Sequence, residues 1–230
     1  MSNIFDRNNF LGKAIKPHIE RMLLKSLKRN LRGVYLRGEL IRPPFVLAMN
    51  HHSFFDGQLV WLLFRHFGIC GSLLVSEENL RSFPMLEAVG ALPTSRIREA
   101  IRRLHEGEAV AIFPEGELRP VGHLGQLKRG VVWLSEKAGV PILPVVSRVF
   151  QRGYENPEAF LLVGNPLSSD LTALKENMEI LLAELDQLYA STSPREPLQG
   201  FSLILRGRLS IDERLKSRWR LLCEVLGFGD

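Results

Sequence analysis

The sequence lacks a hydrophobic run long enough to cross a membrane. A spanning helix needs about 20 consecutive, mostly apolar residues, and no stretch among the 230 residues provides them, although 45% of all residues are hydrophobic. The first ten residues, MSNIFDRNNF, contain Asp6 and no continuous apolar core, unlike a secretory signal peptide. We therefore expect neither a spanning helix nor a leader, and one sizeable core or two small ones.

Cysteine is also scarce. Cys70 and Cys223 are too few for a disulfide framework and suit a reducing compartment. Three common motifs are missing as well: the phosphate loop GxxxxGK[ST], the dinucleotide fingerprint GxGxxG and the nucleophile elbow GxSxG. The chain has no internal repeat and no low-complexity tract. A nucleotide-binding loop or a serine nucleophile of the elbow type is therefore not indicated.

The net charge is positive, +5, which favours polyanionic partners such as nucleic acid, anionic lipid or phosphorylated substrates. Residues 13–32 predict an amphipathic helix. Its apolar side would hold Ile15, Ile19, Met22, Leu23, Leu27 and Leu31, and its basic side Arg21, Lys25, Lys28, Arg29 and Arg32. Such a helix can lie in a membrane interface, or it can pack on the domain with a solvated basic face. Nucleic acid is the weakest alternative, because no aromatic residues alternate with the basic ones.

Short apolar runs alternate with helical patterns after residue 33. The predicted strands are 34–38, 45–49, 72–75, 110–113, 142–150 and 159–164. The predicted helices are 54–67, 96–106, 127–138, 171–190 and 211–226. This alternation predicts an α/β fold with a mostly parallel central sheet flanked by helices. We expect the N-terminal basic amphipathic helix to occupy residues 1–32 and the α/β domain residues 33–230. The segment 215–228 offers Trp219, Leu221, Leu222 and Phe228 as a second membrane contact or as a packing face.

The stretch NHHSFFDG, residues 50–57, follows a predicted strand. Ser53 and Asp56 fit a helix-capping pattern, in which Ser53 is the N-cap and Asp56 lies in the first turn. Capping alone leaves the two histidines without a role. If the chain folds His51 back over the first turn, the Asp56 carboxylate can fix one imidazole nitrogen and leave the other free to take a proton. The stretch therefore predicts both a helix start and a His–Asp base.

Two further stretches stand at strand ends, where active sites of parallel sheets lie. In FPEGELRPVG, residues 113–122, Glu115 is set in a tight turn between Pro114 and Gly116. In GALPTSR, residues 90–96, Arg96 opens a predicted helix, where it could bind a phosphate. Each stretch alone is equally typical of a solvated loop.

Four stretches, NHHSFFD, GALPTSR, FPEGELRP and GVPILPVV, occur together in order. In this the chain resembles the glycerolipid acyltransferase superfamily, in particular the 1-acylglycerol-3-phosphate and lysophospholipid acyltransferases with an HxxxxD motif. The resemblance covers roughly residues 45–150. The sequence departs from the family pattern after Gly116, where ELR stands in place of TRS.

The resemblance implies a role for each block. His51 would be the general base and Asp56 its orienting carboxylate. Arg96 would bind the acceptor phosphate, and Glu115, Gly116 and Lys128 would shape the acceptor pocket. Arg119 would also bind substrate, although it falls one position later than in the family. From the residues themselves, we expect Glu115 to accept hydrogen bonds from loop N–H groups or from an acceptor hydroxyl. The block 139–146 would line the core or the acyl path.

The implied activity is O-acyl transfer from an acyl thioester, acyl-CoA or acyl-carrier protein, to a lysophospholipid hydroxyl in phospholipid biosynthesis. The most direct acceptor is 1-acylglycerol-3-phosphate. The alternatives are a different lipid acceptor, such as an acylated amino acid, a glycolipid or a pigment, and an inactive membrane-binding relative. We expect no metal and no cofactor beyond the donor, because no further ligand stands at a suitable spacing from His51 and Asp56. The expected partners are the donor, the lipid acceptor and an anionic membrane surface, with no nucleic acid. The expected location is peripheral, on the cytoplasmic face.

Overall fold

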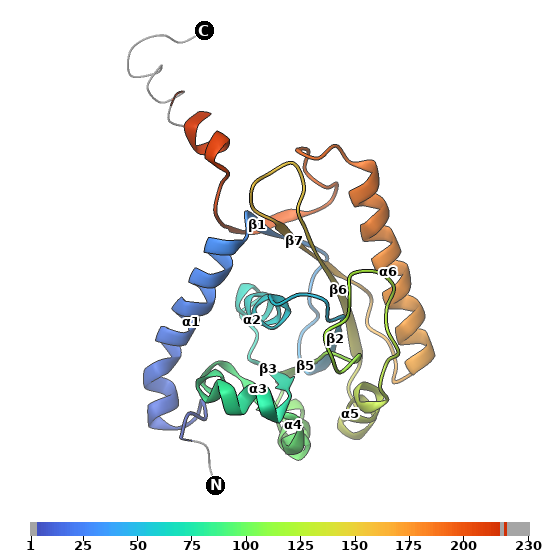
Figure 1. The fold of residues 1–230 in the computed structure, drawn as a ribbon. Coiled ribbons are helices and arrows are strands. Elements are labelled where there is room, and N and C mark those ends of the chain that lie inside the picture. Colours follow the sequence, from blue (N-terminus) through green and yellow to red (C-terminus); the bar gives the residue numbers. More distant parts are fainter. Residues whose placement is uncertain (1–3, 217–218, 220–230) are drawn as a thin grey trace.

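The computed structural model, which describes residues 4–216 and residue 219, is organised around one eight-stranded sheet (Figure 1). Its strands are β1 (Gly33–Arg37), β2 (Phe45–Met49), β3 (Gly71–Val75), β4 (Ala91–Pro93), β5 (Ala109–Ile112), β6 (Ile142–Phe150), β7 (Glu158–Val163) and β8 (Ser202–Arg206). They lie in the order β4-β3-β5-β2-β6-β7-β1-β8. Only the neighbours β6–β7 and β1–β8 are antiparallel in this described sheet. The predicted α/β fold with a mostly parallel sheet is confirmed.

Helices cover both faces of the sheet (Figure 1). They are α1 (Phe10–Asn30), α2 (Asp56–His66), α3 (Glu77–Ser82), α4 (Ile97–His105), α5 (Gly130–Ala138) and α6 (Leu171–Ser191), with two 3-10 helices, η1 (Pro84–Val89) and η2 (Thr94–Arg96). Side chains of α1 and α2 join one apolar core with the sheet. Side chains of α4, α5 and α6 join the other core on the opposite face.

The local sequence explains why the central strands lie where they do. All five residues of β2 are buried, because a strand inside a parallel sheet with both faces covered has no solvent side. The helix α6 begins where Asp170 accepts hydrogen bonds from the backbone N–H groups of Thr172 (2.7 Å) and Ala173 (3.1 Å). Each predicted strand corresponds to a strand of the sheet, and the strand end expected before Arg96 is β4, for which no range was predicted. The strand β8 and the helix α3 were missed.

The parallel arrangement determines where the polar motifs meet. β2 lies between β5 and β6 and is parallel to both, with Ala48 opposite Ile112 and Met49 opposite Val145. The segments that follow β2 and β5 therefore leave the sheet side by side at its carboxyl edge. These are the segments that begin at Asn50 and at Phe113.

The N-terminal helix α1 is both a packing element and an exposed one. Leu23 and Leu27 are buried, and Leu31 directly after the helix is buried as well. Met22 is 50% exposed. Arg32 does not belong to the free basic face, because its guanidinium forms ion pairs that involve Glu158 and Glu213. The other four predicted basic residues, Arg21, Lys25, Lys28 and Arg29, are exposed.

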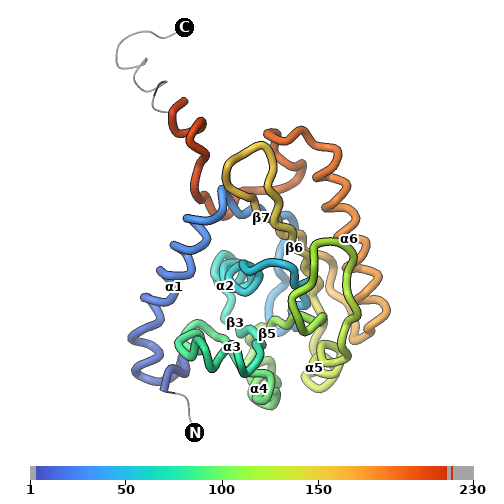
Figure 2. Tube along the Cα trace, viewed as in Figure 1, coloured from blue at the N-terminus to red at the C-terminus, as the bar shows by residue number. Residues whose placement is uncertain are grey.

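The segment after β8 lies beside the C-terminal end of α1 (Figure 2). The backbone N–H of Arg208 donates to the carbonyl of Leu31 (2.8 Å), and the Arg32–Glu213 ion pair joins the same segments. Residues 211–216 are helical. The rest of the predicted helix 211–226, and most of the suggested contact 215–228, lies outside the described residues. Among the helices that are described, none is long and apolar enough to span a bilayer.

If α1 is a packing element at its C-terminal half, Leu27→Ala should lower the free energy of unfolding by about 2–5 kcal/mol. Met22→Ala, on the exposed side of the same helix, should change it by only about 0.5 kcal/mol. Urea unfolding of both variants measures the difference. Equal, small effects of the two substitutions would show that α1 does not contribute to the core.

Candidate active site

The buried carboxylate of Asp56 forms the centre of the site. Asp56 is the first residue of α2 and is fully buried. Its Oδ2 lies 2.9 Å from Nδ1 of His51, and the His51 side chain is 25% exposed. The chain does fold His51 back over the start of the helix, as predicted.

Three further groups donate hydrogen bonds to the Asp56 carboxylate. The backbone N–H groups of His52 and Ser53 donate to Oδ2 at 2.8 Å and 2.7 Å. The hydroxyl of Ser147, on β6, donates to Oδ1 at 3.1 Å. A buried charge without partners would be costly, and these donors, with the positive end of the α2 dipole, compensate it.

The predicted N-cap at Ser53 is wrong. The helix α2 begins at Asp56, with Phe55 in the N-cap position and without a side-chain cap. A turn precedes it, because the Asp56 N–H donates to the Ser53 carbonyl (3.1 Å) and the Phe55 N–H donates to the Ser53 hydroxyl (3.2 Å). The Ser53 hydroxyl therefore accepts a hydrogen bond inside this turn and caps no N–H group of α2. The Asp56 carboxylate accepts from two backbone N–H groups of the same turn.

Glu115 fixes the His51 loop from the neighbouring strand end. The backbone N–H of His51 donates to its Oε2 at 2.8 Å, and the backbone N–H of Gly125 donates to its Oε1 at 2.9 Å. Glu115 is only 2% exposed. The expectation that it accepts hydrogen bonds from loop N–H groups is confirmed, and a direct contact with substrate stays a prediction.

The His51 ring and peptide are held by two more contacts. The Phe113 ring stacks on the imidazole, with the centroids 4.2 Å apart and 13° between the planes. The backbone N–H of Arg119 donates to the His51 carbonyl at 2.8 Å. Both polar groups of the His51 backbone are therefore bonded to the segment that follows β5. In the hydrogen bonds of the described residues, Nε2 of His51 takes no part, so this nitrogen is the one left free.

Two residues of this network were missed by sequence reasoning. The Asn50 side chain accepts from the Ser147 N–H (2.7 Å) and donates to the Ser147 carbonyl (3.2 Å). These bonds fasten the end of β2 to β6. The only signal for them in the sequence is the polar pair Ser147–Arg148 inside an otherwise apolar strand.

His52 points away from the base position and contacts the scaffold. Its Nε2 accepts from the backbone N–H of Val149 and its Nδ1 lies near the side-chain nitrogen of Asn50, both at 3.2 Å. Burial lowers the pKa of His52 below its ordinary value of 6.5, although the nearby Asp56 carboxylate acts in the opposite direction. His52 thus lies beside His51 and contacts Val149 and Asn50, and its prediction as a neighbour of a base at His51 stays a prediction.

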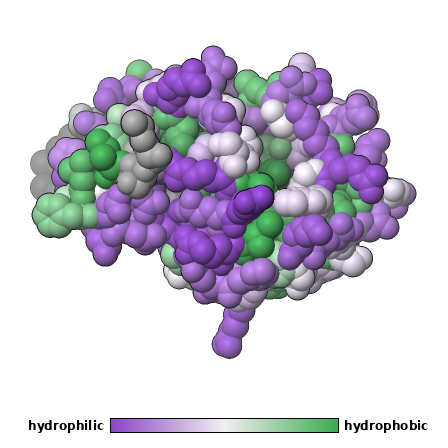
Figure 3. All heavy atoms as spheres, turned by 90° about the horizontal axis from the view of Figure 1, so that it is seen from below, coloured by the Kyte–Doolittle hydropathy of each residue, from purple (hydrophilic) through white to green (hydrophobic). Residues whose placement is uncertain are grey.

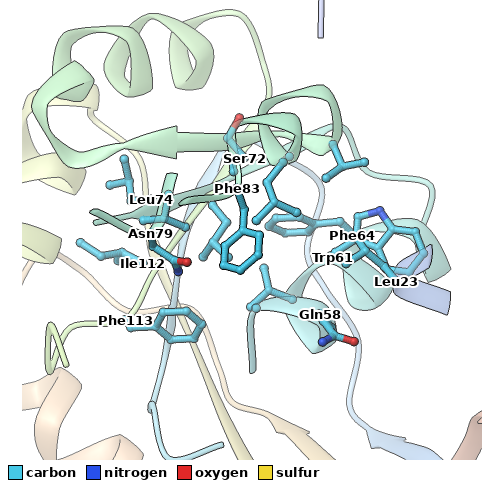
Figure 4. Close-up of a pocket in the computed structure, with 18 of the residues that line it drawn as sticks. Leu23, Gln58, Trp61, Phe64, Ser72, Leu74, Asn79, Phe83, Ile112 and Phe113 are labelled. Carbon is cyan, nitrogen blue, oxygen red and sulfur yellow. The ribbon is translucent and has the colours of Figure 1, made fainter. Parts of the chain in front are cut away.

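A large pocket of about 990 Å³ extends from His51 between α2, β3 and α1. Figure 4 shows its apolar lining, which includes Leu23, Trp61, Phe64 and Phe83. Ligand pockets commonly measure about 300–1,000 Å³ and are mostly apolar. The dimensions and the mostly apolar lining fit a hydrocarbon chain.

Gly116 and Lys128 lie together at the His51 end of this pocket. Gly116 has a φ of +74°, and a β-carbon there would stand 2.5 Å from Nζ of Lys128. Only glycine combines this backbone with such a close neighbour. Within the part of the chain that the structure describes, no carboxylate lies within ion-pair distance of the Lys128 ammonium. Lys128 is therefore free to bind an anion.

The guanidinium groups of the two predicted arginines pair with carboxylates of the chain. Arg96 is at the N-terminal end of α4, with its guanidinium 2.6 Å from the carboxylate of the buried Glu87. Arg119 pairs with Glu117 at 2.7 Å. Neither arginine is among the described residues that line the large pocket. The structure thus brings His51, Gly116 and Lys128 to the pocket, with Asp56 and Glu115 behind them.

The residues of this site are not grouped like a metal centre. Within the described residues, no three side chains of His, Cys, Asp or Glu lie close enough together to hold a metal ion.

The sequence model of the family described as Acyltransferase matches residues 28–148, more than half of the chain. The chain belongs to this acyltransferase family. The matched range begins in α1 and ends in β6, so it contains His51, Asp56, Glu115 and Lys128. The family resemblance that the four motifs carry is confirmed.

Curated relatives share shorter segments with the chain. The chloroplastic 1-acyl-sn-glycerol-3-phosphate acyltransferase of Brassica napus is 25% identical over 115 residues, which cover 44% of this chain and 32% of the relative. Its Arabidopsis thaliana counterpart is 26% identical over 115 residues, with 44% and 31% covered. The enzyme of the same name from Pseudomonas aeruginosa is 44% identical over 48 residues, with 21% and 19% covered. The chain thus spans about a third or less of the length of these relatives.

A solved structure shares the fold. The 1-acyl-sn-glycerophosphate acyltransferase PlsC from Thermotoga maritima superposes with a TM-score of 0.57 at 23% identity. The match covers 80% of this chain and 83% of the PlsC chain. The arrangement of the sheet and its helices is therefore that of a known acyltransferase structure.

The lowered pKa of His52 makes stability depend on pH. The unfolded chain binds a proton near pH 6.5, the ordinary pKa of histidine, whereas folded His52 binds it only at lower pH. Stability from this group is therefore complete above pH 6.5 and falls as the pH decreases toward the folded pKa. We expect wild type to lose more stability than His52→Gln below pH 6.5, measured by urea unfolding at each pH. Parallel pH curves for the two proteins would contradict this.

Proposed function

We propose that the chain transfers a fatty acyl group from an acyl thioester, acyl-CoA or acyl-carrier protein, to a hydroxyl of a lysophospholipid. The observation that carries the proposal is the His51–Asp56 contact of 2.9 Å at the end of an apolar pocket of about 990 Å³. An alcohol is a weak nucleophile at neutral pH, so its acylation needs a base beside an acyl site. The His51–Asp56 pair beside the apolar pocket supports the proposal on both points.

In the proposed reaction, Nε2 of His51 removes the proton of the acceptor hydroxyl. The oxygen attacks the thioester carbonyl, and the C–O ester bond forms as the C–S bond breaks. The proton on His51 passes to the leaving thiolate, so the base returns to its starting state. The Asp56 carboxylate holds Nδ1–H and stabilises the imidazolium formed between the two proton transfers. No covalent acyl-enzyme is proposed, and no cofactor beyond the donor.

The proposed acceptor is 1-acylglycerol-3-phosphate, the compound that the names of the relatives contain. Lys128 supports this choice, because an unpaired ammonium at the His51 end of the pocket can bind a phosphate. Arg96 remains a second candidate, but it would have to share its guanidinium with Glu87.

A different lipid acceptor is the second candidate function. Its support is that the guanidinium groups of Arg96 and Arg119 both pair with carboxylates of the chain. An acceptor with a smaller negative charge than a phosphate monoester would need only Lys128. An acylated amino acid or a glycolipid fits this description.

We further propose that the chain works at the cytoplasmic face of a membrane as a peripheral protein. The exposed cations Arg21, Lys25, Lys28 and Arg29 on α1 support contact with anionic lipids. Each cation near such a surface can contribute about 1 kcal/mol, and salt screens this attraction.

His51→Ala should lower the rate of acyl transfer about 100-fold or more, because the general base is lost. His52→Ala is the matched control and should retain far more activity, because His52 contacts the scaffold and not the pocket end. Transfer of a labelled acyl group from acyl-CoA to lysophosphatidic acid measures both. An inactive His52→Ala with an active His51→Ala would show that His51 is not the base.

Lys128→Ala should raise the KM for the phosphate acceptor about tenfold, the loss of one charge-assisted hydrogen bond. The KM for the donor should change little, and Lys128→Arg should restore part of the acceptor affinity. Arg96→Ala should affect the acceptor KM less but lower stability, because it leaves the Glu87 carboxylate buried and unpaired. Steady-state kinetics with each substrate varied test this, and a larger acceptor effect for Arg96→Ala would reverse the assignment.

A further inference from the structure

Four large apolar side chains are exposed around the opening of the large pocket. Met22 is 50% exposed, Phe54 79%, Phe83 53% and Leu118 57%, and all four line this pocket. They come from four segments: α1, the turn before α2, the junction of α3 and η1, and the loop after β5. Figure 4 shows the Phe83 ring projecting toward the middle of the pocket. We call these four residues the pocket rim.

Single exposed apolar side chains are normal on a protein surface. The pocket rim differs, because four segments far apart in sequence bring such side chains to one opening. Behind the opening lies the apolar pocket itself, so the rim and the pocket form one continuous apolar surface. Contiguous apolar surface of this kind marks a binding site. Figure 3 shows the lower face of the molecule, where apolar surface lies among polar side chains.

We propose that the pocket rim is the surface that docks on a lipid bilayer, with Phe54 and Leu118 inserted among the lipids. The proposal rests on the proposed function, because a lysophospholipid acceptor lies in a bilayer and must reach His51 from there. A rim seated on the membrane lets the lipid acceptor reach the His51 end of the pocket without exposing its hydrocarbon tail to water.

The charges beside the rim favour a membrane with anionic lipids. Glu20 and Glu117 line the pocket, but each pairs with a cation: Glu20 lies 3.3 Å from Arg65, and Glu117 lies 2.7 Å from Arg119. Lys128 lines the same opening and has no such pair among the described residues. Lys128 therefore adds a positive charge at this opening.

The packing of α1 also leaves one of its apolar side chains in the pocket rim. Leu23, Leu27 and Leu31, half of the apolar side predicted for this segment, are used in the core. The basic face of α1 can attract anionic lipids, and Phe10 (89% exposed) and Leu11 (41% exposed) at the start of α1 are further apolar side chains outside the rim. Met22, which α1 keeps exposed, belongs to the pocket rim. The rim thus provides the apolar side chains at the pocket opening, and the basic face of α1 adds attraction to anionic lipids.

Sedimentation of the intact protein with vesicles of phosphatidylcholine and phosphatidylglycerol tests the proposal. Phe54→Ser and Leu118→Ser should each weaken vesicle binding about tenfold, since each removes a large apolar side chain from the lipid. Ile180→Ser is the matched control, because Ile180 on α6 is 65% exposed and does not line the pocket. It should bind vesicles as wild type does.

Phe54→Trp provides a second readout and keeps an aromatic side chain in the rim. It should bind vesicles like wild type, and the added fluorescence should shift to shorter wavelength and be quenched by brominated lipids. Equal vesicle binding by wild type and both serine variants would overturn the proposal. So would an added fluorescence in Phe54→Trp that brominated lipid does not quench. Serine variants that lose binding to acyl-carrier protein but keep vesicle binding would also overturn it.

The vesicle-binding test of the pocket rim and the acyl-transfer test of the proposed function can fail independently of each other. Vesicle binding is measured without donor or acceptor, so loss of the rim contact can be seen in a protein of any activity. Transfer to a dispersed short-chain acceptor tests the reaction without a membrane. A wild type that binds vesicles through the rim but transfers no acyl group would contradict the proposed function alone.

Discussion

The site depends on one buried carboxylate. Asp56 is fully buried at the start of α2 and accepts from His51, from two backbone N–H groups of the preceding turn and from Ser147. A buried carboxylate is stable only with such donors. His51, His52 and Ser53 belong to the turn itself. The hydrogen bonds that compensate the buried charge of Asp56 therefore also orient the His51 imidazole. The histidine is placed before any substrate arrives.

Parallel strands give this turn its second support. Because β2 and β5 are parallel neighbours, their carboxyl ends lie side by side, and Glu115 can bind the His51 N–H. Because β6 flanks β2 on the other side, Ser147 can reach Asn50 and Asp56. The loop is therefore held from both neighbouring strands. Preorganised positioning of this kind is what acid–base catalysis requires.

The sequence revealed those parts of the site that depend on local spacing. The positions of His51 and Asp56 predicted their contact, and the turn around Glu115 predicted its N–H partners. Ser147 was not predictable, because it lies 97 residues from Asn50 and meets it only through the register of β2 and β6. Ser53 was misassigned, because its spacing from Asp56 suits a cap and a preceding turn equally. The strand β4 has only three residues, too few for a periodic pattern.

The central claim is that Asp56 sets the tautomer of His51, with the proton on Nδ1 and Nε2 free to accept the substrate proton. Nitrogen-15 NMR of the imidazoles, with His51 assigned by the His51→Ala spectrum, measures this directly at neutral pH. The account predicts a protonated Nδ1 and an unprotonated Nε2 for His51 in wild type, and loss of this preference in Asp56→Asn. A proton on Nε2 in wild type, or the same spectrum in Asp56→Asn, would contradict it.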